Sequence, residues 1–356
     1  MICESPRESG TQRLGIRRFI YHPFDKRWAY VVSGPLWNRW RPELVRHVST
    51  GAGFVVFRRN AVEPGDGVAL LISKEIGDQH VLHKDGYYIP MRYTTAGEGF
   101  SIGMFNDTRP NLSAAALRYL EGLGYTPKEI AEGKGEAIWF HCLAIAHAPA
   151  YMAENADDLA TRPPRFPLPA SRNLLERSAD LGRKLFELSD VDAPVNSVTA
   201  GVVPGPLGDV AKIVTADGKP LTEEDLEITT PWGRRGINGV SGGNGKIVVW
   251  RDGELLPEVA DEELEHAGGD VTLDVYLNDR VYWKGIPRET WQYSVAGYQV
   301  LKKWLSYRAL AVLDRPLDVD EARQFSETAR RITTILAMVA SLDGNYATAN
   351  EKNAKF

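Results

Sequence analysis

The sequence lacks long hydrophobic runs and holds only two cysteines, Cys3 and Cys142, among its 356 residues. A helix that spans a membrane needs about 20 consecutive apolar residues, so no segment is expected to cross a bilayer. The first fifteen residues are polar and lack the apolar centre of a secretion signal. Because disulfides are rare in reducing compartments, the two cysteines indicate a cytoplasmic protein without disulfide bonds.

Motifs of catalytic sites are also missing. Residues 241–246, SGGNGK, have the composition of a phosphate-binding loop, but Ile247 stands where that motif needs serine or threonine. A strand, and not the helix of a phosphate loop, is expected to follow. Neither a G-x-S-x-G motif nor a spacing that pairs a cysteine with an activating histidine can be recognised. We therefore predict no catalytic residue in this chain.

The histidines do not form a recognisable metal site. His80 and His83 have an H-x-x-H spacing, but no nearby cysteine or convincing acidic ligand accompanies them. His141 and His147 are six residues apart and so lie on different faces of a helix, which is typical of core or edge residues with ordinary hydrogen-bond partners. No metal ion is expected.

Positive charge is the scarcer sign, since 42 lysines and arginines face 47 aspartates and glutamates, a formal net charge of −5. The charges are distributed unevenly along the chain. Residues 13–59 contain ten basic and two acidic residues, a local charge of +8, whereas residues 252–270 contain eight acidic residues and no basic one. A phosphate backbone responds to local positive potential. Charge alone leaves open whether these arginines bind nucleic acid or pair with surface carboxylates.

The pattern of elements predicts an α+β protein, with two β-rich regions around a helical layer and a helical pair at the C-terminus. The first β-rich region covers residues 13–110. Its strand candidates are β-rich runs between turn-forming residues, at 29–32, 53–57, 68–72 and 87–93.

Helical signals fill residues 113–189. Ser113 and Thr126 are N-cap candidates, and Glu129 completes a capping box with Thr126. Residues 136–151 are apolar on most faces, which predicts a buried helix. The leucines of residues 171–188 recur at helical spacing, which predicts an amphipathic one.

A second β-rich region covers residues 190–285. It contains a strand at 246–250 and a hairpin that turns at 278–279. Helices are predicted at 292–310 and at 318–342. The chain is thus expected to comprise a flexible tail, an N-terminal recognition lobe, a C-terminal lobe and a second tail, at residues 1–12, 13–195, 196–343 and 344–356.

Three clusters contain the residue types that read DNA. Arginine reads guanine edges, asparagine or glutamine reads adenine edges, and further cations contact phosphates. The clusters are WNRWR at 37–41, FRRN at 57–60 and the glycine-flanked basic loop WGRRGIN at 232–238. Each cluster is also compatible with surface salt bridges. The candidate DNA-binding residues are Arg39, Arg41, Arg58, Arg59, Asn60, Arg234, Arg235 and Asn238.

Four segments then occur in an order that one enzyme family shares. YHPFDKRW at 21–28 is similar to a Y-R-P-F-D-x-R-W element, and AHAPAY at 146–151 to an L-H-S-P-x-Y helix end. PRFPLP at 164–169 is similar to P-R-I-P-L-P, and GYQVLKKWL at 297–305 matches a G-Y-Q-V-L-K-K-W-L motif. The chain therefore resembles the C-terminal target-recognition domain of type ISP and related single-chain restriction-modification enzymes.

The resemblance implies a partner and a reaction. The full enzymes methylate the exocyclic amine of adenine with S-adenosylmethionine, and type ISP members also carry nuclease and ATP-driven translocase parts. The resemblance thus implies a sequence-specific module that binds double-stranded DNA beside a methyltransferase catalytic domain or chain. His22 and Ala148 depart from the family pattern, which has arginine and serine there.

The catalytic motifs of adenine methyltransferases do not occur in this chain. Residues 162–165, RPPR, have the two prolines of the [DNS]-P-P-[YFW] motif but neither of its outer residues, and no F-x-G-x-G-like cofactor loop is found. We therefore expect no methylation by this chain alone and no bound cofactor, with S-adenosylmethionine held by the missing catalytic domain.

Two alternatives stay open. The chain could complete an active methyltransferase together with a separate catalytic chain. It could also be an interaction module that does not bind DNA, with its nine tryptophans and fourteen tyrosines lining a groove. Core packing explains most of those aromatics more simply. The family motifs are interpreted as packing elements, namely Tyr21, Phe24 and Trp28, and the stripe of Tyr298, Leu301, Trp304 and Leu305.

Overall fold

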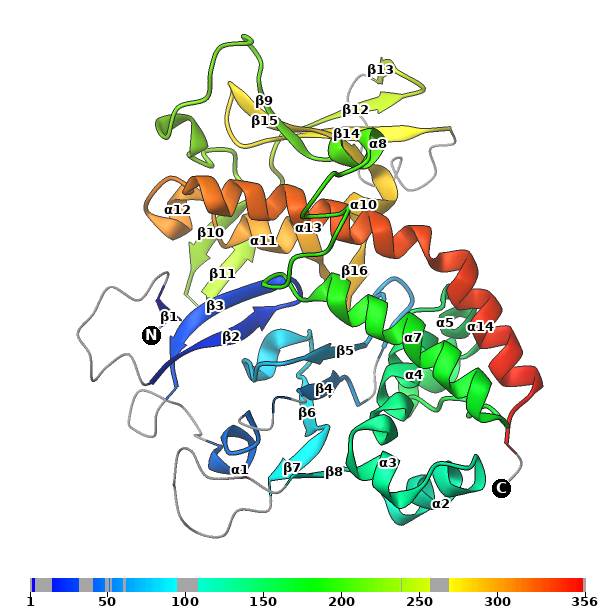
Figure 1. Cartoon of the computed structure of the whole chain (residues 1–356). Helices are drawn as coiled ribbons and strands as arrows, with labels where there is room; N and C mark the ends of the chain where they lie inside the picture. The colour runs from blue at the N-terminus through cyan, green and yellow to red at the C-terminus, as the bar shows by residue number, and fades with distance from the viewer. Residues whose placement is uncertain are drawn as a thin grey trace. The chain divides into compact units, whose positions relative to one another are not determined.

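The structure is a computed structural model with an α+β fold, as expected from the sequence (Figure 1). It describes residues 2–3, 15–31, 41–48, 51, 53–59, 62–94, 108–237, 239–256 and 269–354. The chain forms two compact units. Unit 1 comprises residues 1–190, 295–297 and 339–356, and unit 2 comprises residues 191–294 and 298–338.

The strands of unit 1 form small antiparallel sheets. β3 lies between β1 and β2, β4 lies between β5 and β6, and β7 pairs with β8. Phe54, Val55 and Val56 of β4 are at most 2% exposed, so this strand forms the centre of its sheet and of the local core. The bounds are β1 (Ile2–Cys3), β2 (Ile16–His22), β3 (Asp25–Tyr30), β4 (Phe54–Phe57), β5 (Leu70–Ser73), β6 (Tyr87–Pro90), β7 (Arg92–Thr94) and β8 (Thr108–Pro110).

Two helices of unit 1 begin at the N-cap residues that the sequence predicted. The Ser113 side chain accepts from Ala116 N, and Thr126 and Glu129 form the expected capping box. The predicted helix over 136–151 is two helices, because Pro149 starts a new one. The bounds are α1 (Pro42–Val45), η3 (Gln79–Val81), α2 (Ala114–Gly122), α3 (Pro127–Ala131), η4 (Lys134–Glu136), α4 (Ala137–Ala146), α5 (Pro149–Glu154), α6 (Ala156–Thr161), α7 (Arg172–Ser189) and α14 (Val339–Glu351).

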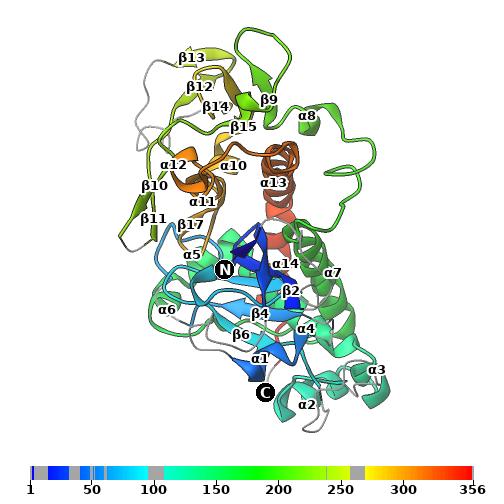
Figure 2. The ribbon, with the colours of Figure 1, turned by 90° about the vertical axis from the view of Figure 1, so that its left-hand side faces the viewer.

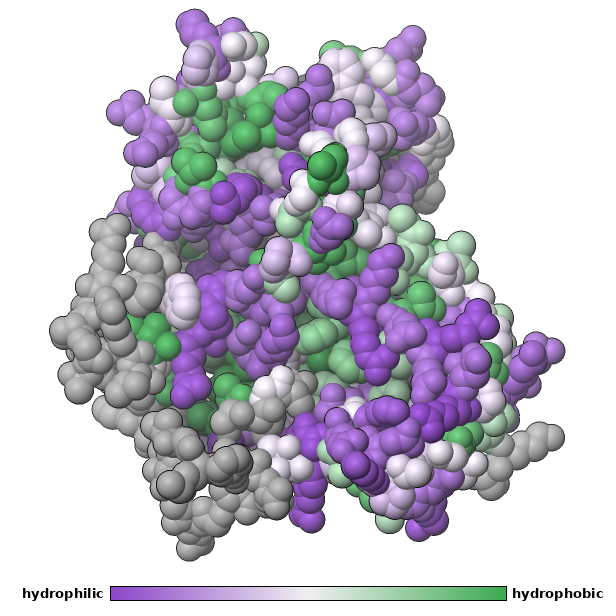
Figure 3. Space-filling model, viewed as in Figure 1, coloured by the Kyte–Doolittle hydropathy of each residue, from purple (hydrophilic) through white to green (hydrophobic). Residues whose placement is uncertain are grey.

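α4 and α7 lie side by side and form the helical core of unit 1 (Figures 1 and 2). The two backbones touch at Gly182, where a Cβ would stand 1.9 Å from the carbonyl oxygen of Phe140. Leu175, Leu185 and Leu188 of α7 are at most 1% exposed. Figure 3 shows mainly hydrophilic side chains over the outer faces of α7 and α3, as expected for amphipathic helices.

The C-terminal residues of the chain differ from their predicted structure. The sequence predicted one helix from 318 to about Leu342 and a tail at 344–356, but α13 ends at Ala337 and a separate helix, α14, runs from Val339 to Glu351. Leu342, Tyr346 and Ala349 are at most 5% exposed and lie at helical spacing, so this segment packs into unit 1. The signal was weak because glycine, alanine, asparagine and threonine occupy most other positions of the helix.

Unit 2 is built on a five-stranded antiparallel sheet with the order β13-β12-β14-β15-β9. The predicted strand at 246–250 is β12, and the predicted hairpin is β14–β15, in which the carboxamide oxygen of Asn278 accepts from the backbone of Arg280 and Val281. The bounds are β9 (Lys212–Thr215), β10 (Gly233–Gly236), β11 (Gly239–Gly242), β12 (Ile247–Arg251), β13 (Glu254–Leu256), β14 (Val271–Tyr276) and β15 (Val281–Pro287).

The helices of unit 2 include one that the sequence misjudged. Residues 292–310 are not a single helix, because the chain turns at Ala296 and Gly297, whose φ values are 47° and 83°. Positive φ cannot continue a right-handed helix. The bounds are α8 (Gly205–Gly208), η5 (Glu224–Leu226), α10 (Arg288–Gln292), β16 (Ser294–Val295), β17 (Tyr298–Gln299), α11 (Val300–Ser306), α12 (Leu310–Leu313) and α13 (Val319–Ala337).

Three aromatic side chains form the centre of unit 2. Trp283 of β15 packs against Phe325 of α13 with ring centroids 4.0 Å apart, and Trp304 of α11 lies 5.3 Å from Phe325. All three are at most 2% exposed. Such buried aromatic pairs stabilise a core beyond the area they bury. The GYQVLKKWL motif therefore supplies a packing element, as predicted.

His141 is a core residue with both ring nitrogens bonded. Its Nδ1 lies 2.7 Å from the Ser178 hydroxyl and its Nε2 lies 2.8 Å from the Pro167 carbonyl oxygen. A neutral ring that donates from Nε2 and accepts at Nδ1 satisfies both contacts. Burial lowers the pKa of His141 to about 4, and the pKa of buried His147 falls to about 4 for the same reason.

The folded protein is expected to lose stability as the pH falls from 6.5 towards 4. Unfolded histidine titrates near 6.5 and binds the proton first, so acid favours the unfolded chain. Each of these two buried histidines should lower the free energy of unfolding by about 2 kcal/mol at pH 5 relative to pH 8. Urea unfolding at both pH values measures this difference. His141→Gln should remove the contribution of His141, and an unchanged pH dependence in that variant would contradict the assignment.

Candidate nucleic-acid interface

Part of the positive charge of residues 13–59 is paired with carboxylates inside unit 1. Lys26 of β3 is 6% exposed and contacts Glu75 at 2.7 Å and Asp190 at 2.5 Å. Burial alone would lower the pKa of Lys26, but the two carboxylates outweigh it and raise the pKa. Arg27 pairs with Asp25 at 3.1 Å. The family motif at 21–28 thus supplies internal ion pairs, and the local charge of +8 overstates the positive surface.

The prediction that Arg58 contacts DNA is wrong, because its side chain is buried. Its side chain is 0% exposed, and its Nη1 lies 2.9 Å from the Asp66 carboxylate. The Arg58 N–H donates to Ala69 O, which extends the β4–β5 pairing by one residue. Side chains alternate along an extended strand, so Arg58 points inward and Arg59 outward. Arg58 is fully buried in this structure, so it has no exposed surface with which to contact DNA.

Two other candidates of unit 1 lie on its surface. Arg41, the N-cap residue of α1, and Arg59, just after β4, are both exposed. Neither has an ion-pair partner among the residues that the structure describes. Arg39 and Asn60, which the sequence placed beside them, lie outside the described residues.

The basic loop predicted at 232–238 is a β-hairpin in unit 2. β10 and β11 pair from Gly233–Gly242 to Gly236–Gly239, and Arg234 and Arg235 are exposed on β10. Arg235 Nη2 donates to Val312 O at 2.6 Å. Figures 1 and 2 show the hairpin extending beyond α11 and α12. The third candidate of this cluster, Asn238, lies outside the described residues.

The base of this hairpin is held firmly. Trp232 is 1% exposed, its Nε1 donates to Tyr276 O at 2.8 Å, and its ring packs edge-on against Trp291 with centroids 5.5 Å apart. Gly233 touches the carbonyl oxygen of Ser306, since a Cβ there would lie only 1.9 Å away. The two arginines therefore project from an anchored ribbon, which limits the entropy lost when they bind a partner.

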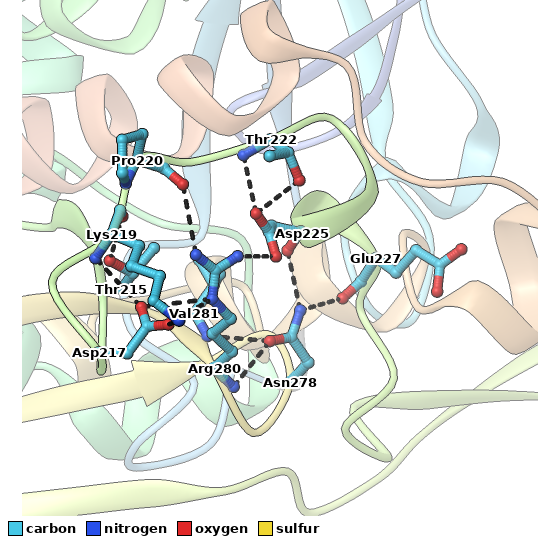
Figure 4. Close-up of polar contacts among 10 residues, drawn as sticks. All are labelled: Thr215, Asp217, Lys219, Pro220, Thr222, Asp225, Glu227, Asn278, Arg280 and Val281. Atoms are coloured by element: carbon cyan, nitrogen blue, oxygen red, sulfur yellow. Dashed lines mark hydrogen bonds and ion pairs between the residues drawn. The ribbon is translucent and has the colours of Figure 1, made fainter.

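Arg280 shows the opposite case, an arginine neutralised by its own unit (Figure 4). Its guanidinium pairs with Asp225 and with Asp217, the latter at 3.3 Å, and donates to Pro220 O. The Arg280 contact and the Thr222 hydrogen bonds lower the pKa of Asp225 to about 2. This network fastens the β14–β15 turn to the preceding loop, so Arg280 is structural.

The glycine-rich segment at 241–246 begins in β11 and continues as the connection to β12, so a strand follows it as expected. A Cβ on Gly245 would lie 2.1 Å from the Trp232 ring, so this glycine packs against the hairpin base. Among the described residues, no three His, Cys, Asp or Glu side chains are grouped as metal ligands. Within the same residues, every helix is too short or too polar to cross a lipid bilayer.

The family described as "Type ISP C-terminal specificity domain" matches residues 3–334, nearly the whole chain. The chain belongs to this family. No curated protein sequence matches this specificity domain.

Three solved structures share its fold. A nuclease-deletion mutant of the Type ISP restriction-modification enzyme LlaGI, in complex with a DNA substrate mimic, is 15% identical with a TM-score of 0.50 and aligns with 96% of this chain. A DrdV–DNA complex is 18% identical over 95% of this chain, with a TM-score of 0.56. DNA-bound LlaBIII, an ATP-dependent Type ISP restriction-modification enzyme, is 12% identical over 99%, with a TM-score of 0.50. The aligned parts are 26%, 29% and 19% of those chains.

Sequence reasoning missed the most exposed apolar side chain of the candidate interface. Ile237, which follows β10, is 104% exposed. The flanking glycines, Gly236 and Gly239, were a signal for a tight hairpin turn, because glycine is common in two-residue turns. The cluster was interpreted through its arginines, so the isoleucine in the turn was overlooked.

Proposed function

We propose that this chain is a sequence-specific recognition module for duplex DNA and works as the specificity part of a restriction-modification enzyme. The observation that carries the proposal is the anchored β10–β11 hairpin, with Arg234 and Arg235 exposed on one strand. A two-stranded ribbon fits the major groove of B-DNA, and arginine serves both phosphates and guanine edges. The DNA-bound state of LlaGI and DrdV, whose fold this chain shares, supports the choice of partner.

The remaining candidates would supply further contacts. Arg41 and Arg59 are exposed in unit 1 and suit phosphate contacts, and Arg39, Asn60 and Asn238 stay predictions from the sequence. The net charge of −5 does not oppose this proposal, because binding depends on the potential near the contact surface. Arg58 and Arg280 do not belong to the proposed contact set, because each is already paired with a carboxylate.

We also propose that methyl transfer to the exocyclic amine of adenine belongs to a separate catalytic domain or chain. The support is the sequence, which lacks the two-proline motif and the cofactor loop of adenine methyltransferases. Isothermal titration of this chain with S-adenosylmethionine should therefore give no heat of binding. Saturable binding at micromolar concentration would show that this chain holds a cofactor site of its own.

Selection from a library of random duplexes tests the proposed recognition. The purified chain is incubated with the library at low salt, bound duplexes are recovered, and several rounds are sequenced. A recognition module should enrich one short sequence, and the titrated affinity for it should fall steeply with salt. Binding without any enriched sequence, or no binding at low salt, would contradict the proposal.

A further inference from the structure

The tip of the β10–β11 hairpin carries an apolar side chain that nothing in unit 2 covers among the described residues. Ile237 is 104% exposed, more than any other large hydrophobic residue described. A core or a partner normally covers such a side chain, because burying an isoleucine is favourable by about 1.5–3 kcal/mol. Arginines and glycines surround it in the sequence, so a neutral protein surface is a poor match. Its position points to a partner that is polyanionic and also offers a small apolar group.

The dimensions of the hairpin match the major groove. The strands of a β-ribbon lie about 4.8 Å apart, which with side chains fits a groove about 12 Å wide and exceeds the minor groove, about 6 Å wide. Ile237 follows Arg234 by three residues, about 10 Å along a strand, and the major groove is about 8.5 Å deep. When Arg234 is level with the phosphates, Ile237 is therefore at the floor of the groove.

The chemistry of the groove floor then limits what Ile237 can contact. The base edges there present hydrogen-bond donors and acceptors, and the 5-methyl group of thymine is the apolar group that they offer. An isoleucine side chain forms no hydrogen bonds. Contact with a polar base edge would therefore remove water from hydrogen-bond donors and acceptors without replacing the lost hydrogen bonds. Contact with the thymine methyl group buries apolar surface of both the isoleucine and the base away from water.

We propose that the β10–β11 hairpin enters the major groove and that Ile237 recognises a thymine through its 5-methyl group. This inference rests on the proposed DNA-recognition function and assigns a base preference to one side chain of that site. Arg234 and Arg235 point to opposite faces of the ribbon, so they face the two phosphate backbones that flank the groove. Arg235 keeps further N–H donors for a phosphate beside its bond to Val312 O.

Replacement of thymine by uracil tests the inference, because uracil lacks only the 5-methyl group. Each thymine of the selected target is replaced in turn, and the dissociation constants of the full chain and of Ile237→Ala are measured on every duplex. One replacement should weaken wild-type binding about tenfold. Ile237→Ala should bind the original target about tenfold more weakly and be insensitive to that same replacement. Val202→Ala is the matched control, since Val202 of unit 2 is 87% exposed and lies away from the hairpin in sequence.

The outcomes separate the inference from the function on which it rests. Equal responses of wild type and Ile237→Ala to every uracil duplex, or a selected target without thymine, overturn the role of Ile237 while DNA recognition stands. A chain that binds no duplex overturns the recognition function itself, and the inference with it. Thermal unfolding of Ile237→Ala should match wild type, because the Ile237 side chain is fully exposed.

Discussion

Neutralising the hairpin arginines with Arg234→Gln and Arg235→Gln is expected to weaken DNA binding about 100-fold or more at 0.1 M salt. Each guanidinium should form a charge-assisted hydrogen bond with a phosphate, which is favourable by about 1.5 kcal/mol or more. Loss of two phosphate contacts should also make the slope of log K against log salt less negative by about 2. Fluorescence anisotropy on the selected duplex at several salt concentrations measures both effects.

The control removes the same charge elsewhere in unit 2. Lys212 and Lys284 are exposed cross-strand partners on β9 and β15, so Lys212→Gln with Lys284→Gln changes the net charge equally. This pair should change the affinity less than threefold. Equal losses in the two double variants would mean that overall charge, and not the hairpin, drives binding.

The second large effect concerns the base of the same hairpin. Gly233→Ala is expected to destabilise unit 2 by about 2–3 kcal/mol, because the added Cβ would lie 1.9 Å from the carbonyl oxygen of Ser306. The atoms that the new Cβ would meet all belong to the Ser306 backbone. The backbone segments at Gly233 and Ser306 must therefore move apart, because no flexible side chain can turn aside. Urea unfolding followed by tryptophan fluorescence reports mainly on unit 2, which contains five of the nine tryptophans.

Gly242, the cross-strand partner of Gly233, provides the matched control. A Cβ at Gly242 would meet nothing within 4 Å. Gly242→Ala should therefore be neutral or stabilise the protein by about 0.5 kcal/mol, through the lower entropy of the unfolded chain. Similar losses for both variants would contradict the close packing at the hairpin base.

Elements with strong local signals could be predicted from the sequence. The capping boxes at Thr126 and Asp318 formed as expected, since each cap depends on residues only three positions apart. The Asn278 turn formed for a similar reason. Patterns of this kind are complete within one short segment, so tertiary contacts are not needed to interpret them.

Elements that depend on tertiary contacts were predicted less well. Residues 292–310 have a helical pattern of apolar side chains, but the turn at Ala296 and Gly297 interrupts it. The helix beyond Leu342 lacks a strong apolar stripe and is stabilised by packing within unit 1. In both cases the decisive interaction lies outside the window over which a periodicity is judged.

The candidate interface shows the same limit for single residues. FRRN at 57–60 places two adjacent arginines after a strand, and alternation makes one of them interior, but the sequence does not indicate which. The Asp66 carboxylate that pairs with Arg58 comes from a later segment of the chain. The basic cluster at 232–238 was identified by composition as a loop, and its hairpin structure was not predicted. The anchor of that hairpin depends on the contact between Gly233 and Ser306, which are far apart in sequence.

Competition between two duplexes tests the central claim most directly. The wild-type chain is titrated with its selected target and with a scrambled duplex of the same length and composition, at physiological salt. Specific recognition predicts that the target binds at least 1,000-fold more tightly. Equal dissociation constants for the two duplexes would contradict the claim that this chain reads a DNA sequence.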